Sequence, residues 1–319
     1  MSHTRILFSC DFHGSNRCLS KFLNAAKLNI YKAQVFMLSG DLTGKAIVPI
    51  VERPNGEFLV EFQGAVETVN NSERLKQLVK MIGDAGFYAY VTNPEEASLI
   101  GQDEKKRMDL FSKLMVQRVE EWMRLAEEKL AGKGVKCFVM PGNDDHDDIA
   151  PVIDSSSAVT NPEGKVVLID EHHEMISSGY SSPTPWKTPR EVPEEKLAEM
   201  IEAMTSKVQD MKSCIFNLHD PPYDSGLDTA PQLDEKIQMV SSGGQPVMVP
   251  VGSKAVRSSI EKYQPLLGLH GHIHESGGAT MIGRTRCLNA GSEYQSGVLR
   301  GYIIDIEKEK VIRYLRIEG

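Results

Sequence analysis

The chain has 319 residues, of which 40% are hydrophobic, and its formal net charge is −8. This amount of apolar material is typical of a globular protein with one large α/β domain or two ordinary ones. The acidic balance argues against a polyanionic partner such as nucleic acid, which usually leaves a basic footprint, and favours a small ligand or a metal.

The first apolar run and the cysteines indicate the cellular compartment and the kind of metal site. The run at residues 6–10 is too short for a signal-peptide core or a membrane span, so we expect a cytoplasmic protein without a membrane segment. The five cysteines show no CxxC spacing, and Cys10, Cys137 and Cys214 lie inside apolar runs. We interpret them as buried hydrophobic residues, so any metal must be held by nitrogen and oxygen.

Apolar runs alternate with segments of helical period in the first half of the chain, which is typical of strands covered by helices. The fold class is therefore α/β. An Asn-Gly turn signal at Asn55 and Gly56 predicts a β-hairpin. The elements predicted in chain order are a strand at 5–10, a helix at 16–28, a strand at 35–39, a hairpin at 47–62, helices at 72–82 and about 103–130, and a strand at 135–140.

The second half of the chain continues the pattern with a long loop in it. We expect a single domain over residues 1–319, with a hairpin and helix insertion at about 44–102. The remaining predicted elements are strands at 165–169 and 173–180, a helix at 193–211, a strand at 213–218, a loop at about 223–252, a helix at 253–263, a strand at 265–270, and three β segments between 277 and 317.

Five polar clusters each follow an apolar run that we interpret as a strand. In open α/β sheets, ligands bind at the carboxyl ends of strands, so clusters that are distant in sequence converge in one crevice. Gly40 and Asp41 alone carry little weight, because Gly83 and Asp84 repeat the pair at the end of a helix. The order and placement of all five carry the prediction. They are Asp11 with His13, Gly40 with Asp41, Gly142 to Asp145, His219 with Asp220, and Gly271 to His274.

The clusters supply two Asp, one Asn and four His as candidate ligands. This mixture suits Mn²⁺, Fe, Zn²⁺ or Ni²⁺ better than it suits Ca²⁺ or Mg²⁺, which prefer oxygen alone. Seven ligands are too many for one ordinary site. Two ions that share a bridging carboxylate would use all of them, and such a pair is suited to in-line displacement at phosphorus.

In this order, the clusters resemble the signature of the calcineurin-like metallophosphoesterase superfamily, and they look closest to its bacterial and archaeal phosphoesterases. The turn from Asn289 to Ser292 agrees with that signature. The resemblance implies a four-layer fold, in which two mixed β-sheets pack as a sandwich flanked by helices. It also implies two divalent metal ions, with manganese expected before iron, zinc or nickel. Between these ions a hydroxide would attack a phosphodiester or phosphomonoester.

The resemblance also assigns the ligands, position by position. One ion would be held by Asp11, His13 and His274, with Asp41 bridging to a second ion held by Asn143, His219 and His272.

This chain departs from the family pattern at one position beside the metals. The family usually places a His after the Asn of the third cluster, where it assists the leaving group, and this chain has Asp144 there. A carboxyl with a raised pKa is one replacement, and His146 is another. We therefore take Asp144, Asp145 and His146 as the catalytic candidates. His172 and His173 are interpreted as a turn or an exposed strand pair.

Several further residues, most of them in or next to loops, are candidates for lining the substrate cleft. They are Tyr180, Ser181, Ser182, Trp186, Tyr223 and Arg257. The expected partner is a small phosphate ester, with nucleotides among the candidates. We expect neither a membrane nor nucleic acid as a partner, and a homo-oligomer is one alternative. Two other functions are weighed: a metal-binding interaction protein with little catalysis, prompted by Asp144 and the hairpin insertion, and a nuclease, against which the acidic charge argues.

Overall fold

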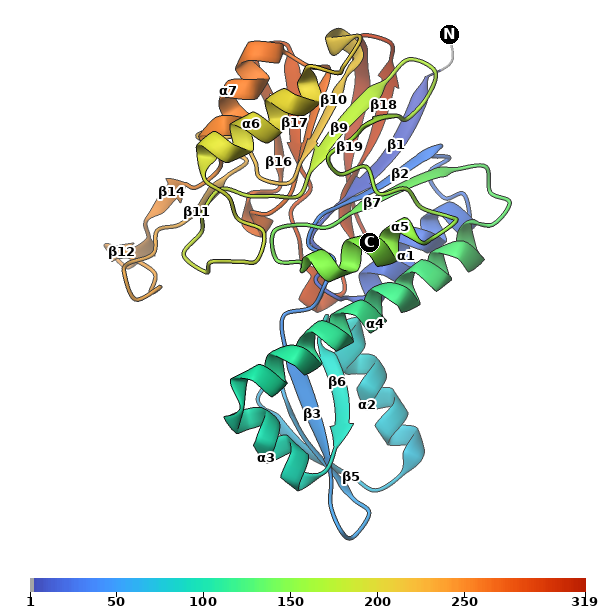
Figure 1. Cartoon of the computed structure of the whole chain (residues 1–319), viewed down its shortest axis with the longest axis vertical. Coiled ribbons are helices and arrows are strands. Elements are labelled where there is room, and N and C mark those ends of the chain that lie inside the picture. The colour runs from blue at the N-terminus through green and yellow to red at the C-terminus, as the bar shows by residue number, and fades with distance from the viewer. Residues whose placement is uncertain (1–2) are drawn as a thin grey trace.

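The computed structural model describes residues 3–319 and contains two large β-sheets (Figure 1). The first sheet has the order β19-β18-β1-β2-β7. Its parallel strands are β1 (Thr4–Ser9), β2 (Val35–Ser39) and β7 (Lys136–Met140), and β18 (Arg300–Glu307) and β19 (Lys310–Glu318) add antiparallel pairs.

The second sheet has the order β16-β17-β15-β10-β9-β8. Its four central strands are parallel, and the strand at each edge is antiparallel to its neighbour. The strands are β8 (Val166–Leu168), β9 (Glu174–Ser178), β10 (Ile215–Leu218), β15 (Leu267–His270), β16 (Gly278–Ile282) and β17 (Thr285–Asn289).

The two sheets face each other across a shared apolar core. Side chains alternate along β1, so Ile6 and Phe8 point into the core between the sheets while Leu7 points to the opposite face. Helices α1 (Asn16–Lys27), α4 (Glu104–Leu130) and α5 (Ala150–Asp154) cover that opposite face. The outer face of the second sheet packs on α6 (Glu194–Thr205) and α7 (Lys254–Tyr263). The order through the molecule is helices, sheet, sheet, helices, which makes the protein α/β.

Side-chain caps determine where several helices begin. Ser15 accepts the Cys18 amide at the start of α1, and Ser253 accepts the Val256 amide at the start of α7. Asp103 accepts the Lys106 amide at the start of α4. Each cap satisfies a backbone donor that has no partner inside the helix, which stabilises the helix by about 1 kcal/mol.

A lobe formed by residues 47–102 stands apart from the two large sheets (Figure 1). The expected hairpin is β3 (Ile47–Glu52) and β4 (Phe58–Phe62), and β5 (Ala65–Val69) and β6 (Tyr88–Thr92) extend it to a sheet of order β5-β4-β3-β6. Helices α2 (Ser72–Asp84) and α3 (Pro94–Gln102) complete the lobe, which has a small core of its own. Helix α4 contacts α3 of the lobe and α1 of the main body.

The second half of the chain differs from the sequence prediction in three places. Helix α6 ends at Thr205, not at residue 211, because the amides of Gln209 and Asp210 donate to the Glu174 carboxylate and are not available to continue the helix. Residues 277–317 form four strands, not three. The predicted long loop carries β11 (Thr229–Pro231) paired with β14 (Met248–Pro250), and β12 (Ser241–Ser242) paired with β13 (Gln245–Pro246), as a projecting arm (Figure 1).

The sequence led to two further expectations, one about the cysteines and one about membrane-spanning helices, which concern residues that the structure describes. The five cysteines there are all buried and free. Over the same residues, every helix is too short or too polar to cross a bilayer.

Candidate metal centre

The seven side chains expected as metal ligands lie together where five strands end. Strands β1, β2 and β7 of the first sheet and β10 and β15 of the second end at one edge of the molecule. Backbone hydrogen bonds join the loops that follow, because Gly40 N–H donates to the Met140 carbonyl at 3.2 Å and Gly271 N–H donates to the His219 carbonyl at 3.0 Å. The residues brought together are Asp11, His13, Asp41, Asn143, His219, His272 and His274.

One group of four ligand atoms surrounds a common point. The Nε2 atoms of His13 and His274 are 2.9 Å apart, and Asp41 Oδ2 lies 3.6 Å from the first of them. Asp11 Oδ1 lies 3.6 Å from His274 Nε2. Donors that share one ion at about 2.1 Å are about 3.0–3.4 Å from each other. The spacing of this group therefore fits a single cation.

A second group lies beside the first and shares Asp41 with it. His219 Nε2 is 3.5 Å from Asp41 Oδ2, and His272 Nδ1 is 2.8 Å from Asn143 Oδ1. A carboxylate common to two groups of donors is the arrangement by which a protein holds two ions close together.

One buried nitrogen of the cluster, Nε2 of His219, lacks a hydrogen-bond partner in the described part of the chain. The Nδ1 atom of His219 bonds the Ser39 carbonyl at 3.0 Å, which leaves its Nε2 pointing at the carboxylates. This Nε2 has no hydrogen-bond partner among residues 3–319. An unsatisfied buried nitrogen costs about 1–3 kcal/mol, and a coordinated cation removes that cost.

The electrostatics of the cluster favour positive charge. Burial raises the pKa values of Asp11 and Asp41, but the imidazoles of His274 and His219 outweigh it and hold both pKa values below the ordinary range. Burial lowers the pKa of His219, but the charge of Asp41 outweighs it and raises that pKa to about 10. Without a cation, the two buried carboxylates thus keep a proton on His219. A bound divalent cation would supply that positive charge in place of the proton.

The backbone at the cluster is strained. Four residues of the cluster have positive φ angles, in the left-handed region that residues other than glycine seldom adopt. They are Asp11 (56°), His13 (41°), Asp41 (50°) and His272 (66°). Such conformations cost about 1–3 kcal/mol each and persist at functional sites. The adjoining Gly40, at φ 97°, is required for packing too, because a Cβ there would lie 2.2 Å from the His219 ring.

A chain of hydrogen bonds orients Asn143. Its Nδ2 donates to Thr188 Oγ1 at 2.9 Å, and the Thr188 hydroxyl donates to Glu191 Oε1 at 2.7 Å. The amide oxygen therefore faces His272, as a ligand oxygen must. Sequence reasoning missed Thr188 and Glu191, which lie in a Pro-rich loop and match no motif.

Asp144 lies beside the cluster in an ion pair with Lys45. Lys45 Nζ is 2.8 Å from Asp144 Oδ2, which lies 3.7 Å from His13 Nδ1. Burial and the charge of Asp41 raise the pKa of Asp144 to about 6, although Lys45 acts in the opposite direction. Sequence reasoning missed Lys45 as well, because a single lysine after a strand-end turn carries no signal.

Asp145 and His146 lie elsewhere. The Asp145 carboxylate accepts the amides of Leu42, Thr43 and Gly142 at 2.7–2.9 Å, so it fixes the turns after β2 and β7. The His146 ring bonds Ser112 Oγ on α4 at 3.2 Å. Neither side chain lines the cavity described below. Of the three residues taken as catalytic candidates, only Asp144 lies beside both the clustered ligands and the cavity.

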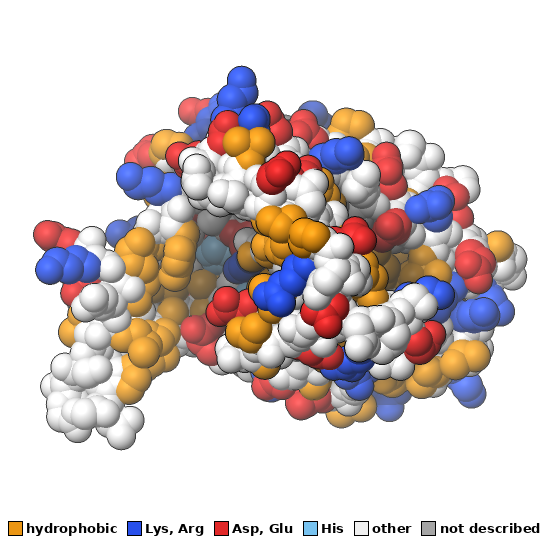
Figure 2. Space-filling model, turned by 90° about the horizontal axis from the view of Figure 1, so that it is seen from below, with side chains coloured by type: hydrophobic (Ala, Val, Ile, Leu, Met, Phe, Trp, Pro, Cys, Tyr) orange, Lys and Arg blue, Asp and Glu red, His pale blue; other side chains and the backbone are white. Residues whose placement is uncertain are grey.

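A cavity of about 760 Å³ opens beside the cluster, and Figure 2 shows a histidine at the base of a hollow between the arm and the main body. Asp41, Asn143, His272 and His274 form its polar end, next to Lys45 and Asp144. Of the loop residues expected in the cleft, Trp186 lines this cavity, whereas Tyr180, Ser181, Ser182, Tyr223 and Arg257 do not.

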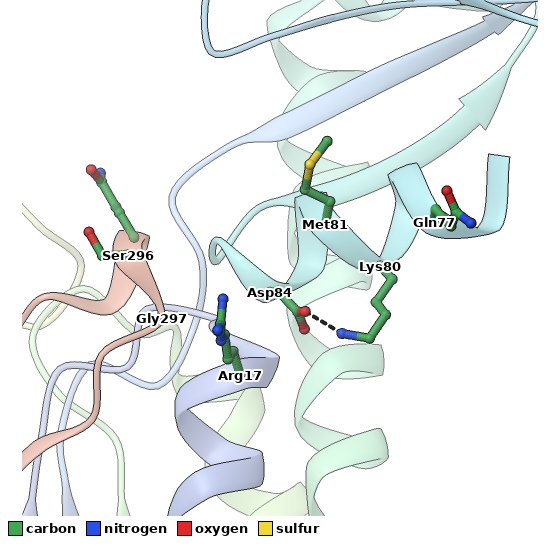
Figure 3. Close-up of a pocket in the computed structure, with 8 residues that line it drawn as sticks. Arg17, Gln77, Lys80, Met81, Asp84, Ser296 and Gly297 are labelled. Carbon is green, nitrogen blue, oxygen red and sulfur yellow. Dashed lines mark hydrogen bonds and ion pairs between the residues drawn. The ribbon is translucent and has the colours of Figure 1, made fainter. Parts of the chain in front are cut away.

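A smaller cavity of about 260 Å³ lies at the junction of α1, α2 and residues 295–297 (Figure 3). Lys80 and Asp84 form an ion pair there, and Arg17 reaches the same space. None of the seven clustered side chains lines this smaller cavity.

One histidine expected at the surface is buried and fully bonded. His173, expected in a turn or exposed strand pair, is 2% exposed. Its Nδ1 bonds Asp170 Oδ2 at 2.6 Å, and its Nε2 bonds the Glu307 carbonyl at 3.0 Å. Because both ring nitrogens have protein partners, we interpret this pair as structural.

A curated archaeal protein is related to this chain. The uncharacterized protein MJ1162 of Methanocaldococcus jannaschii is 31% identical over 166 residues, which cover 51% of this chain and 67% of that protein. The chain belongs to the family of MJ1162. No family model matches the sequence.

Solved structures share the fold. The crystal structure of TT1561 from Thermus thermophilus covers 100% of this chain and 99% of its own, at 14% identity and a TM-score of 0.54. A second crystal structure covers 99% of both chains at 14% identity and a TM-score of 0.58. An archaeal phosphodiesterase aligns with a TM-score of only 0.25, which is too low to bear on fold or function.

Proposed function

We propose that the protein is a phosphoesterase that uses two divalent metal ions. The observation that carries the proposal is the pair of donor groups that share the buried carboxylate of Asp41 beside a large cavity. The donors are nitrogen and oxygen only, which suits Mn²⁺, Fe, Zn²⁺ or Ni²⁺, with manganese first. The order of the motifs along the chain supports the same interpretation, through its resemblance to the calcineurin-like metallophosphoesterases.

The residues of the site divide into those that would hold the metal ions and those that would act on the substrate. Asp11, His13 and His274 would hold one ion, and Asn143, His219 and His272 the other, with Asp41 between them. When bound, the ions supply Lewis acidity that brings the pKa of water toward neutrality and neutralises phosphoryl oxygens. Lys45 lies on the cavity side of the cluster, where its ammonium can bind a phosphoryl oxygen. Asp144, in contact with Lys45, would hold a proton for the leaving oxygen.

The nuclease alternative has little support from the cavity. Within residues 3–319, Lys45 is the one Lys or Arg that lines it, and it is already paired with Asp144. A nucleic-acid groove needs several cations along a phosphate backbone. The remaining alternative is a metal-binding interaction protein with weak catalysis, which binds the ions without turnover.

The test is metal-dependent turnover. We expect protein stripped with a chelator and reloaded with Mn²⁺ to hydrolyse p-nitrophenyl phosphate or bis-p-nitrophenyl phosphate, and His219→Ala to be inactive on both. Metal binding without turnover, with several metals and from pH 6 to 9, would support the interaction protein instead.

A further inference from the structure

We propose that the substrate of this site is an amphiphile, in which the reacting phosphate is the sole charged group and the remainder is a bulky apolar group. The proposal rests on the proposed phosphoesterase function and specifies its substrate class. It follows from the composition of the cavity away from the metal ligands.

Beyond its polar end, the cavity is lined by apolar side chains from two segments of the chain, which form two walls. One wall comes from the arm and includes Pro231, Leu233 and Val249, and the other is the loop with Pro183, Pro185 and Trp186. Figure 2 shows hydrophobic side chains on both sides of the hollow. Trp186 is 63% exposed, an unusual state for so large an apolar side chain. An apolar ligand held between the walls would cover it.

Both walls are held in place before any ligand arrives. The Asp228 carboxylate, at the base of the arm, accepts the amides of Asp224 at 2.8 Å and Gly252 at 3.0 Å. The opposite loop is bound to Glu191, whose carboxylate accepts the amides of Thr184 at 3.0 Å and Thr188 at 2.7 Å. A preformed apolar wall binds an apolar group with little loss of conformational entropy.

The charges of the cavity restrict the ligand further. Lys45 is its one Lys or Arg in the described part of the chain, and it lies at the metal end, 2.8 Å from Asp144. Glu275 also lines the cavity and would repel a second anionic group. A nucleotide or sugar with a further phosphate would find no cation there, whereas an alkyl, acyl or aromatic group would bury its surface against the walls.

The experiment compares esters that differ only in the apolar group. Ethyl p-nitrophenyl phosphate and octyl p-nitrophenyl phosphate have the same leaving group and charge, and ethyl phosphate and octyl phosphate make the corresponding monoester pair. Each buried methylene is worth about 0.8 kcal/mol, or about fourfold in affinity. We expect the Mn²⁺-loaded protein to favour the octyl ester at least about tenfold in kcat/KM, measured below the concentration at which the esters aggregate.

Two variants remove one wall each. Trp186→Ala and Leu233→Ser are each expected to bring the octyl preference down to about threefold or less. Met239→Ser is the matched control, because Met239 is an exposed apolar residue of the arm that does not line the cavity. It should keep the full preference.

Fluorescence reports binding without turnover. The chain has two tryptophans, and Trp122 is 2% exposed, so a change on binding arises from Trp186. We expect octyl phosphate, but not ethyl phosphate, to shift the emission to shorter wavelength, and Trp186→Phe to abolish the shift.

The outcomes separate the two proposals. Equal kcat/KM for octyl and ethyl esters, or an octyl preference that survives both wall variants, would overturn the amphiphile and leave the phosphoesterase standing. No hydrolysis of any ester by loaded protein would overturn the phosphoesterase, and the substrate class with it.

Discussion

Two clusters in this protein place an aspartate beside a buried histidine, and they differ in how many of their polar atoms have partners. In the pair of Asp170 and His173, both ring nitrogens and both carboxylate oxygens are hydrogen-bonded. In the pair of Asp41 and His219, the Nε2 atom of the histidine has no hydrogen-bond partner within the described residues. A satisfied cluster stabilises the fold, whereas an unsatisfied nitrogen beside two carboxylates could bind a metal ion.

The largest expected effect is a loss of bound metal and activity when the Asp41 cluster is altered, but not when the Asp170 pair is altered. Asp41→Asn removes the shared carboxylate and should lower hydrolysis by at least about a thousandfold, since metal ions supply several kcal/mol of transition-state stabilisation. Elemental analysis should find the bound metal lost. Asp170→Asn is the matched control and should keep both metal and activity. If Asp41→Asn kept a full complement of metal, Asp41 would not be a ligand.

The next effect concerns stability on metal removal. Ligand at a hundredfold excess over its Kd adds about 2.7 kcal/mol per site, so a chelator should lower the Tm of the wild-type protein by several degrees. Asp170→Asn should respond in the same way from a lower starting Tm. Asp41→Asn should not respond, and a response equal to that of the wild type would point to a metal site elsewhere.

A smaller effect comes from the hydrogen bonds that orient Asn143. Thr188→Val keeps the shape of the side chain but removes the hydroxyl that accepts the Asn143 amide. Loss of such a supporting contact typically costs about 10–100-fold in metal affinity or activity. Thr184→Val, in the same loop and bonded to the same Glu191, is the control and should change activity much less. Equal losses would mean that Thr188 acts only through the loop.

The smallest effect is a stability change with a definite pH dependence. Burial raises the pKa of Asp170, but hydrogen bonds from His173 and Thr4 outweigh it and hold that pKa below the usual 3.8. A lowered carboxyl pKa adds stability that is present above about pH 4 and is lost as the pH falls through the folded-state value. Asp170→Asn should therefore cost about 1–3 kcal/mol in urea unfolding at pH 6.

The difference between wild type and Asp170→Asn should shrink as the pH is lowered from 5 to 3. A difference that stays constant over this range would show that the carboxylate charge is not what stabilises the pair.

The convergence of the ligands was predictable because the signal is local and strong. Strands β1, β2, β7, β10 and β15 are short apolar runs, and a candidate ligand follows each, so the carboxyl-end rule for sheets was enough to predict that Asp11 and His272 lie in one cluster. The distances and the φ angles of these residues were beyond the sequence, because they depend on how the two sheets pack.

Other parts were unpredictable for physical reasons. Helix α3 of the lobe has a weak pattern, since it has no buried residue and its amphipathic face is faint. Lys45 and Thr188 become neighbours of the ligands only through tertiary contacts. The arm pairs β11 with β14 across a segment whose Gly, Ser and Pro content is typical of a loop.

The central claim is that distant side chains hold two metal ions around Asp41. The most direct measurement is anomalous diffraction from crystals of Mn²⁺-loaded protein, together with elemental analysis of the same sample. We predict two ions per chain, one bound by Asp11, His13 and His274 and one by Asn143, His219 and His272, with Asp41 contacting both. No anomalous peak at this cluster, with its imidazoles bonded to other protein groups, would contradict the account.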